Sequence, residues 1–147
     1  MGFLEYSPGE EAWRPVHAQG WLFVHCLWVY PRAKGFKGLG TDLIRACLGE
    51  ADQTGAEGVV AIVSDGPWLV GPELFRKSGL ETVDRADRFE LVALRLRGDS
   101  TPRFRDIVEI RALYKGLHVV YCPQCPMLPK SVNDLTRVAG EHNMKLN

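Results

Sequence analysis

Hydrophobic and polar positions predict alternating strands and helices along the first half of the chain. Apolar runs at 3–6 and 21–29 predict two strands joined by a segment rich in Pro, Gly and Glu. Apolar residues then recur at helical spacing over 39–51, which predicts an amphipathic helix that ends near Gly55. The continuous apolar run at 58–63 predicts a central strand covered on both faces.

The second half of the chain continues the alternation of helices and strands as far as residue 97, and a polar segment then separates it from the C-terminal part. A helix is predicted at 70–78 with Gly79 as its cap, and 80–97 alternates as two antiparallel strands that turn around 84–87. The polar, Pro-containing segment 98–103 is the best linker candidate. Beyond it we expect a helical stretch near 104–114, a strand at 117–121 and a helix at 130–142. The element order predicts an α/β fold with a mixed sheet.

Composition narrows the class of protein. The chain has 147 residues, of which 46% are hydrophobic and 24% charged, enough for one good core. Lys plus Arg equals Asp plus Glu at 18 each, so no global field attracts nucleic acid or a membrane surface, and a small-molecule or protein partner is expected. The N-terminus lacks the features of a signal peptide, and four cysteines do not make a secreted disulfide framework, so we expect a cytoplasmic protein.

The glycine-rich turn after the strand at 21–29 is a candidate phosphate cradle. Gly35, Gly38 and Gly40 allow close backbone approach and positive φ, and Lys37 adds a cation. The unpaired amides at the start of the following helix point at one spot, where the helix dipole favours an anion. The spacing is not that of a P-loop, and an ordinary tight strand-to-helix turn is the alternative.

The turn and its neighbours resemble a known family. Val29-x-Pro31 followed by Gly35-Phe-Lys-Gly-Leu-Gly40 resembles the R/Q-x-x-G-x-G/A motif of the GNAT acetyltransferase superfamily. The blocks 59–63 and 72–80 resemble the family's next strand and helix, so the likeness covers residues 21–97 in three blocks. Gly35 stands where the motif usually has Arg or Gln, and Phe75 stands where many members carry a general-acid Tyr.

The resemblance implies a GNAT fold and acetyl-CoA as cosubstrate. The main chain of Leu27 and Val29 would bind pantetheine in a gap between two strands. The amides that would hold the diphosphate belong to Gly35, Lys37, Gly38, Leu39, Gly40 and Thr41. The implied acceptor is a small-molecule or peptide amine, and a homodimer is compatible with this class.

Two residues are candidates for the base that strips the acceptor's proton. His25 would stand beside the thioester gap, and a core or surface histidine satisfied by a neighbour is the alternative. Cys26 would point to the opposite face in a regular strand. Glu10 aligns with a Glu of the relatives and could act through water, or it is a solvated loop carboxylate. The tryptophans that could wall an acceptor pocket, or simply build the core, are Trp13, Trp21 and Trp28.

The C-terminal part has a second candidate site. Together with the N-terminal EYSPGEEAWRPV, the CPQCP turn resembles GNAT proteins fused to a YoaP-like, thioredoxin-related domain, relatives that are longer at both ends. By that comparison the chain is truncated at both ends and divides into a GNAT core at 1–97, a linker and helix at 98–116, and a partial thioredoxin-like segment at 117–147. Cys122 and Cys125 would be a redox dithiol, half of a zinc site, or inert thiols.

The function expected from these features is acetyl-CoA-dependent N-acetylation of an amine by direct attack, with no bound metal. A non-catalytic CoA- or partner-binding module is the competing class, because Phe75 lacks a hydroxyl and N-terminal elements of the family are missing. A redox protein based on the CPQC dithiol is the third.

Overall fold

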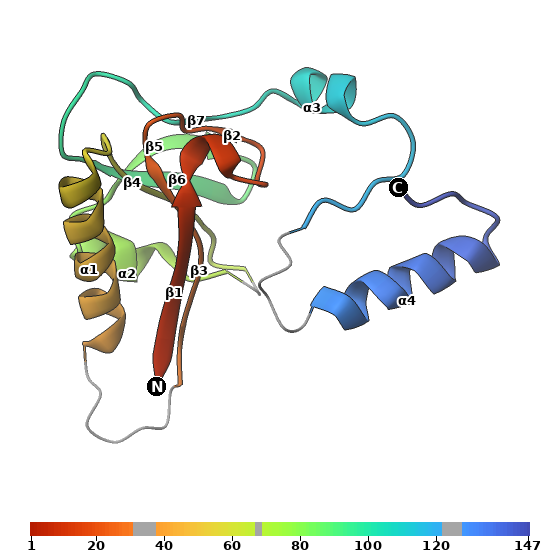
Figure 1. Cartoon of the computed structure of the whole chain (residues 1–147), viewed down its shortest axis with the longest axis horizontal. Coiled ribbons are helices and arrows are strands. Elements are labelled where there is room, and N and C mark those ends of the chain that lie inside the picture. The colour runs from red at the N-terminus through yellow and green to blue at the C-terminus, as the bar shows by residue number, and fades with distance from the viewer. Residues whose placement is uncertain (31–37, 67–68, 122–127) are drawn as a thin grey trace. The chain divides into compact units, whose positions relative to one another are not determined.

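The structure is a computed structural model that describes residues 1–30, 38–66, 69–121 and 128–147. It divides into two compact units, Met1–Phe104 and Arg105–Asn147 (Figure 1). Across the described residues, no helix combines the length and the apolar character needed to traverse a lipid bilayer.

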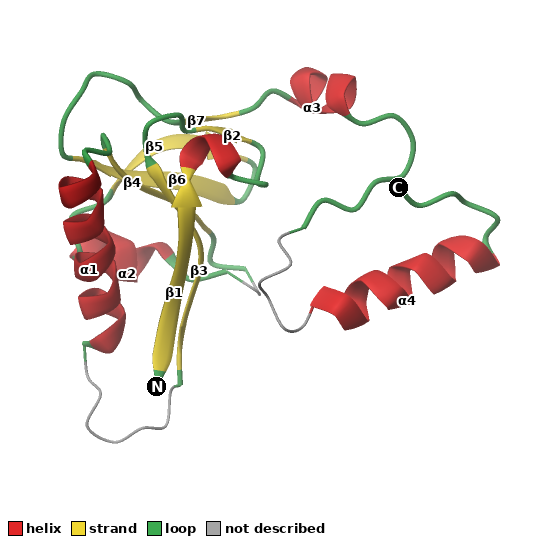
Figure 2. Ribbon diagram, in the orientation of Figure 1, coloured by secondary structure: helices red, strands yellow, loops and turns green. Residues whose placement is uncertain are grey.

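A five-stranded mixed sheet forms the centre of the first unit. Its order is β1-β3-β4-β6-β5, and only the β3–β4 pair is parallel (Figure 2). The mixed α/β fold predicted from the hydrophobic pattern is confirmed. The strands are β1 (Gly2–Pro8), β3 (Leu22–Val29), β4 (Gly58–Val63), β5 (Glu81–Ala86) and β6 (Phe89–Arg95).

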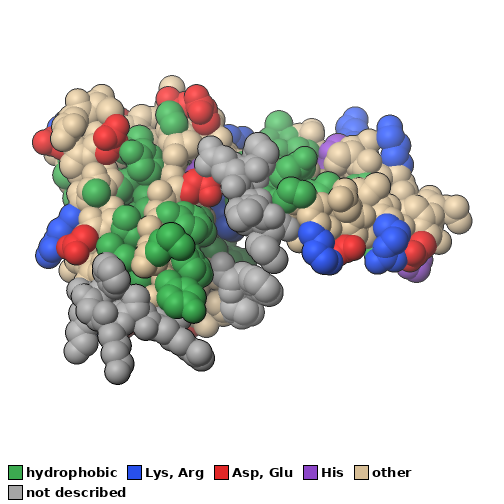
Figure 3. All heavy atoms as spheres, turned by 60° about the horizontal axis from the view of Figure 1, so that its bottom comes forward, with side chains coloured by type: hydrophobic (Ala, Val, Ile, Leu, Met, Phe, Trp, Pro, Cys, Tyr) green, Lys and Arg blue, Asp and Glu red, His purple; other side chains and the backbone are tan. Residues whose placement is uncertain are grey.

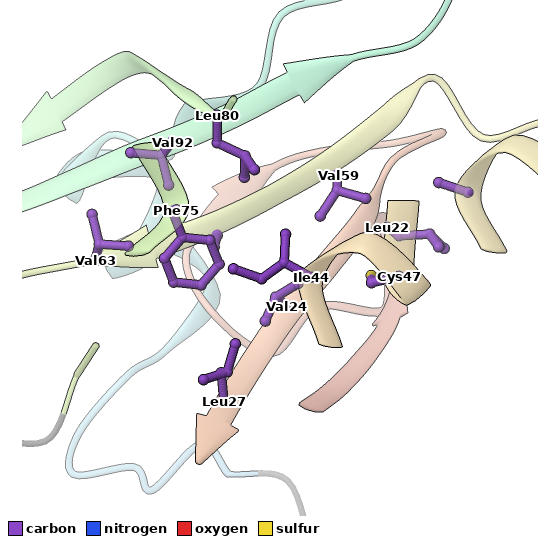
Figure 4. Packing of buried hydrophobic residues seen from close by; sticks show 12 residues of the cluster. Leu22, Val24, Leu27, Ile44, Cys47, Val59, Val63, Phe75, Leu80 and Val92 are labelled. Atoms are coloured by element: carbon purple, nitrogen blue, oxygen red, sulfur yellow. The ribbon is translucent and has the colours of Figure 1, made fainter. Parts of the chain in front are cut away.

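Two helices cover one face of this sheet. The helix α1 (Leu39–Thr54) crosses from β3 to β4 and ends at Gly55, whose φ of 78° makes it a left-handed cap. The helix α2 (Pro72–Lys77) is shorter than predicted, although Gly79 follows it with a φ of 91° as expected. Figure 4 shows the apolar residues packed between these helices and the sheet, among them Leu22, Val24, Leu27, Ile44, Val59, Phe75 and Leu80.

The other face is covered by irregular chain and two very short strands. The strands β2 (Val16–His17) and β7 (Arg103–Phe104) pair with each other and, with the 3-10 helix η1 (Gly9–Glu11), lie along this side. Val16, Trp21, Phe23 and Val60 form a second buried cluster there. Because Val59 packs on the helical face and Val60 on this one, β4 is covered on both faces, as predicted.

Residues 98–103, predicted as a linker, lie within the first unit. Pro102 is buried, and the Ser100 hydroxyl accepts a hydrogen bond of 2.8 Å from the Trp21 indole. Ser100 in turn bonds to the Glu57 carboxylate through its backbone and its hydroxyl. Residues 98–103 therefore cover the second cluster and are held there by hydrogen bonds that could not be predicted from composition.

The second unit contains α3 (Ile107–Leu113) and α4 (Leu128–Glu141). The strand predicted at 117–121 is wrong: among the described residues a single parallel bridge forms there, between Leu117 and Leu146. A strand needs a neighbour along its length to bond its backbone groups, and the backbone partner found here for Leu117 and Val119 in the described chain is Asn147. Ala139 is the one buried hydrophobic residue of this unit in the part of the chain that the structure describes.

Candidate active site

The parallel strands β3 and β4 separate part-way along their length. Their pairing runs over Leu22–Val59, Phe23–Val60 and Val24–Ala61 and then stops, although both strands continue. A small cavity lies where they part, with about 40 Å³ of space that water can enter. It is lined by Val24, His25, Cys26 and Leu27 of β3, Ala61 and Ile62 of β4, Leu69, Val70 and Phe75.

A β-bulge at His25 changes which side chains face this region. Glu5 pairs with Cys26 and Tyr6 pairs with Val24, so His25 is an extra residue without a partner on β1. Val24 and Leu27 both pack on the helical face, three positions apart, which leaves His25 and Cys26 between them. The regular alternation that would send Cys26 to the face opposite His25 therefore does not hold here.

One ring nitrogen of His25 has a hydrogen-bond partner on β1. Ser7 Oγ lies 3.1 Å from the Pro8 carbonyl oxygen and 2.9 Å from His25 Nε2, within hydrogen-bond distance of both. The tautomer of the ring decides whether Ser7 or Nε2 is the donor in the second bond. Nδ1 is buried and finds no hydrogen-bond partner in the described part of the chain. Ser7 thus holds the ring through Nε2, and Nδ1 has no partner among the described residues.

The surroundings of His25 favour its neutral form. Burial lowers the pKa of the imidazole below its ordinary value, and the Arg14 cation lowers it further, while the Glu5 carboxylate opposes both. The ring stacks on Trp13, with centroids 5.8 Å apart and planes 7° from parallel, and lies 4.9 Å from the Phe23 ring. A neutral imidazole next to an open strand gap can accept a proton at physiological pH.

The start of α1 has the conformation that the glycine motif predicted, as far as it is described. Gly38 caps the helix with a φ of 94°, and no side-chain cap hydrogen bond forms there among the described residues. Gly40 is helical, and a Cβ there would lie 2.9 Å from Leu74 of α2, so this glycine allows the helices to pack closely. Leu39 and Thr41 complete the first turn, whereas Gly35 and Lys37 lie outside the described residues.

Of the other residues predicted for the site, some line the cavity between β3 and β4 and one lies away from it. Leu27 lines the cavity and Val29 follows it on the separated part of β3, as a pantetheine-binding backbone would require. Phe75 lines the cavity too and has no proton to donate. Glu10 is elsewhere: its carboxylate accepts a bond of 3.3 Å from the Gly20 amide and does not line the cavity. Glu10 lines a different pocket, together with Trp21 and Glu50.

The tryptophans and cysteines singled out in the sequence also lie in different parts of the structure. Trp21 is buried in the core beneath 98–104, whereas Trp13 stacks on His25. Trp28 is 42% exposed and lies between Phe3 and Tyr30, with both neighbouring rings tilted to it, in an exposed aromatic row. Figure 3 shows hydrophobic side chains gathered on one face of the first unit. Of the cysteines, Cys47 is a core thiol whose pKa burial raises to about 12, and the predicted dithiol Cys122 and Cys125 lies outside the described residues.

Sequence reasoning missed Ser7 and Arg14. Ser7 is informative only through its distance to His25, and Arg14 only through its position over Trp13, 4.5 Å from the ring centroid. Both lie in the segment EYSPGEEAWRPV that carries part of the family resemblance, but nothing in its sequence assigns either residue a role. Among the described residues, no group of three His, Cys, Asp or Glu side chains is arranged to hold a metal ion.

Comparison with known proteins gives one clear relative. The chain is 33% identical over 148 residues to the uncharacterized N-acetyltransferase YoaP of Bacillus subtilis, a match that covers 97% of this chain. The chain spans 59% of the length of that relative. A scan against models of protein families finds none that matches.

Two solved structures show partial likeness. One is a GNAT family acetyltransferase from Brucella melitensis in complex with acetyl-CoA, 25% identical with a TM-score of 0.39, where the match covers 59% of this chain and 49% of the other. The second is the GNAT family N-acetyltransferase YhbS of Escherichia coli in complex with CoA, 21% identical with a TM-score of 0.49, covering 71% and 60%.

Proposed function

We propose that the chain is an acetyl-CoA-dependent N-acetyltransferase of the GNAT family. The observation that carries the proposal is the opening between β3 and β4, next to a helix that begins at a left-handed glycine. A thioester arm laid along the unpaired backbone of β3 would reach His25, and its diphosphate would meet the amides of α1. The 33% identity to a protein named as an N-acetyltransferase supports the same assignment.

The reaction is direct attack of an amine on the thioester. The amine nitrogen bonds to the acetyl carbon, the carbon–sulfur bond breaks, and the products are an acetamide and CoA. The His25 imidazole, which lines the cavity at the strand opening, takes the proton of the attacking amine. Phe75 cannot protonate the leaving thiolate, so the imidazolium or water supplies that proton.

Several finer expectations stay predictions. They are Glu10 as a base through water, the diphosphate contacts of Gly35 and Lys37, dithiol chemistry at Cys122 and Cys125, a thioredoxin-like C-terminal segment, a homodimer and a cytoplasmic location.

Binding of acetyl-CoA tests the proposal, and the two caps of α1 offer a matched pair of variants. Gly38 and Gly55 both have positive φ, and a Cβ on either meets nothing within 4 Å. Gly38→Val and Gly55→Val should therefore cost similar stability, about 1–2 kcal/mol. Only Gly38→Val should weaken acetyl-CoA binding, by about tenfold or more, because it disturbs the amides at the helix start.

Calorimetric titration with acetyl-CoA measures the affinities, and urea unfolding checks that the two variants are matched. Absence of binding to the wild-type chain would refute the proposal. Equal weakening by both variants would remove the helix start from the site.

A further inference from the structure

Aromatic rings and a hydroxyl hold the imidazole of His25 in two different ways. The Trp13 ring is stacked on it, with planes 7° from parallel, and the Phe23 ring lies 4.9 Å away, tilted by 59°. These contacts limit the tilt of the imidazole but not its rotation within its own plane, because apolar contact is non-directional. That rotation is limited by Ser7 of β1, whose Oγ lies 2.9 Å from Nε2.

The pairing of β1 with β3 brings Ser7 to this ring. Ser7 pairs with Phe23, whereas His25 is the extra residue of the bulge and has no partner on β1. Paired residues of an antiparallel sheet share a face, so Ser7 lies on the face of the second buried cluster, to which Phe23 belongs. The bulge turns the His25 side chain to the same face, as its contacts with Phe23 and Ser7 show.

Protonation of His25 fixes the direction of its hydrogen bond with Ser7. The neutral ring has two tautomers, and Ser7 can donate to one and accept from the other. The imidazolium carries a proton on both nitrogens, so Nε2 can only donate and Ser7 Oγ can only accept. The hydroxyl proton of Ser7 then points to the Pro8 carbonyl oxygen, which lies 3.1 Å from Oγ. The charged ring therefore begins a chain of two hydrogen bonds, whichever tautomer the neutral ring adopts.

This chain favours the form of His25 that exists after the amine has lost its proton. A hydrogen bond donated by a charged group is about twice as strong as one between neutral groups. Burial acts in the opposite direction and lowers the pKa of the imidazole, with the Arg14 cation in the same direction and the Glu5 carboxylate of β1 against it. The other residues that line the cavity are apolar, apart from the Cys26 thiol. Ser7 therefore offsets part of the cost of a buried cation.

We propose that Ser7 is a positioning residue: it orients the imidazole of His25 and, with the Pro8 carbonyl, stabilises the imidazolium that forms when the acceptor amine gives up its proton. This deepens the proposed function, on which it rests, by assigning a second residue to the proton transfer. Ser7 does not line the cavity and acts through His25.

A pH titration of the imidazole signals by nuclear magnetic resonance tests the hydrogen-bond chain directly. Ser7→Ala should lower the pKa of His25 by about half a unit to one unit, because the charged form loses more than the neutral form. The chain has four histidines, and His25→Gln identifies the signal of His25. Ser7→Thr keeps a hydroxyl on the same carbon and should restore the wild-type value.

Tyr6→Phe is the matched control. It also removes one hydroxyl from β1, at the adjacent residue, whose charge interactions are with Glu50 and Cys47 of α1. The pKa of His25 should stay at its wild-type value in this variant. An equal shift in Tyr6→Phe, or a wild-type pKa of His25 in Ser7→Ala, would overturn the proposal.

The same substitution should act on the reaction. In CoA release at saturating acetyl-CoA, Ser7→Ala should lower kcat by about threefold to tenfold, and the acid limb of the pH–rate profile should move to lower pH by the same shift. Ser7→Thr should restore both. A loss of rate without that shift would make the role of Ser7 structural and would contradict the proposal, as would an unchanged rate.

The titration separates this inference from the proposed function, because it needs neither acetyl-CoA nor an acceptor. If the chain binds no acetyl-CoA, the acetyltransferase proposal fails, and the pKa of His25 can still be measured in every variant. A lowered pKa in Ser7→Ala, restored in Ser7→Thr, would support the hydrogen-bond chain. An unchanged pKa would overturn it.

Discussion

The two halves of β3 are built from similar apolar residues yet do different things. Over Leu22–Val24 the strand is bonded on both edges, to β1 and to β4, and buried on both faces. Beyond Val24 it keeps β1 but loses β4, and a bulge turns His25 and Cys26 to one side. The first half stabilises the fold, and the second half has one edge without a partner strand among the described residues and carries the imidazole that we propose as the base.

The difference follows from pairing rather than from hydrophobicity. A parallel neighbour satisfies the backbone of the first half, so its side chains only pack. Without that neighbour, the backbone groups of the second half are available to a ligand, and the extra residue of the bulge frees the imidazole from the strand alternation. One strand thus joins a rigid core to a site, which keeps the site's geometry fixed.

The largest expected effect tests the paired half. Phe23 is fully buried in the second cluster, and Phe23→Ala should lower the free energy of unfolding by about 3–5 kcal/mol through lost burial and a cavity. Trp28→Ala in the other half removes a larger but 42% exposed ring and should cost less than about 2 kcal/mol. Urea unfolding followed by circular dichroism measures both. A larger loss for Trp28→Ala would mean that the separated half carries the core.

The next effect tests the separated half. His25→Gln should lower kcat about a hundredfold or more, because the base is lost, while acetyl-CoA affinity stays unchanged. Cys26→Ser is the control, since Cys26 lies beside His25 and lines the same cavity. CoA release at saturating acetyl-CoA gives the rates. An unchanged kcat in His25→Gln would show that His25 is not the base and would leave Glu10 or water as the candidates.

Local periodicity predicts the frame of this molecule but not the features that make the site. The helix at 39–54 and the strand at 58–63 can be predicted from the sequence because the spacing of their own apolar residues shows which positions are buried. The bulge at His25 cannot be predicted from periodicity, since it depends on how β3 is paired with β1. Arg14 is informative only because folding places it over the Trp13 ring. The strand predicted at 117–121 shows the reverse error, in which strand-forming residues find no partner strand in the part of the chain that the structure describes.

The smallest expected effect is a pH dependence of stability that comes from the same histidine. Burial lowers the pKa of His25 below its ordinary value of 6.5, with Arg14 in the same direction and Glu5 against it. The unfolded chain therefore binds a proton at a higher pH than the folded one. The stabilisation is fully present above about pH 6.5 and is lost as the pH falls through the lowered pKa of the folded state.

The urea midpoint should then fall more between about pH 7.5 and 5.5 in the wild-type chain than in His25→Gln. His142→Gln, an exposed histidine of the second unit, is the control and should behave as the wild type. Comparing the variants cancels the other groups that titrate in this range, so the residual slope belongs to His25. An equal slope in the wild type and His25→Gln would mean that the imidazole is not held neutral by burial, and the separated half of β3 would then lack a base poised at physiological pH.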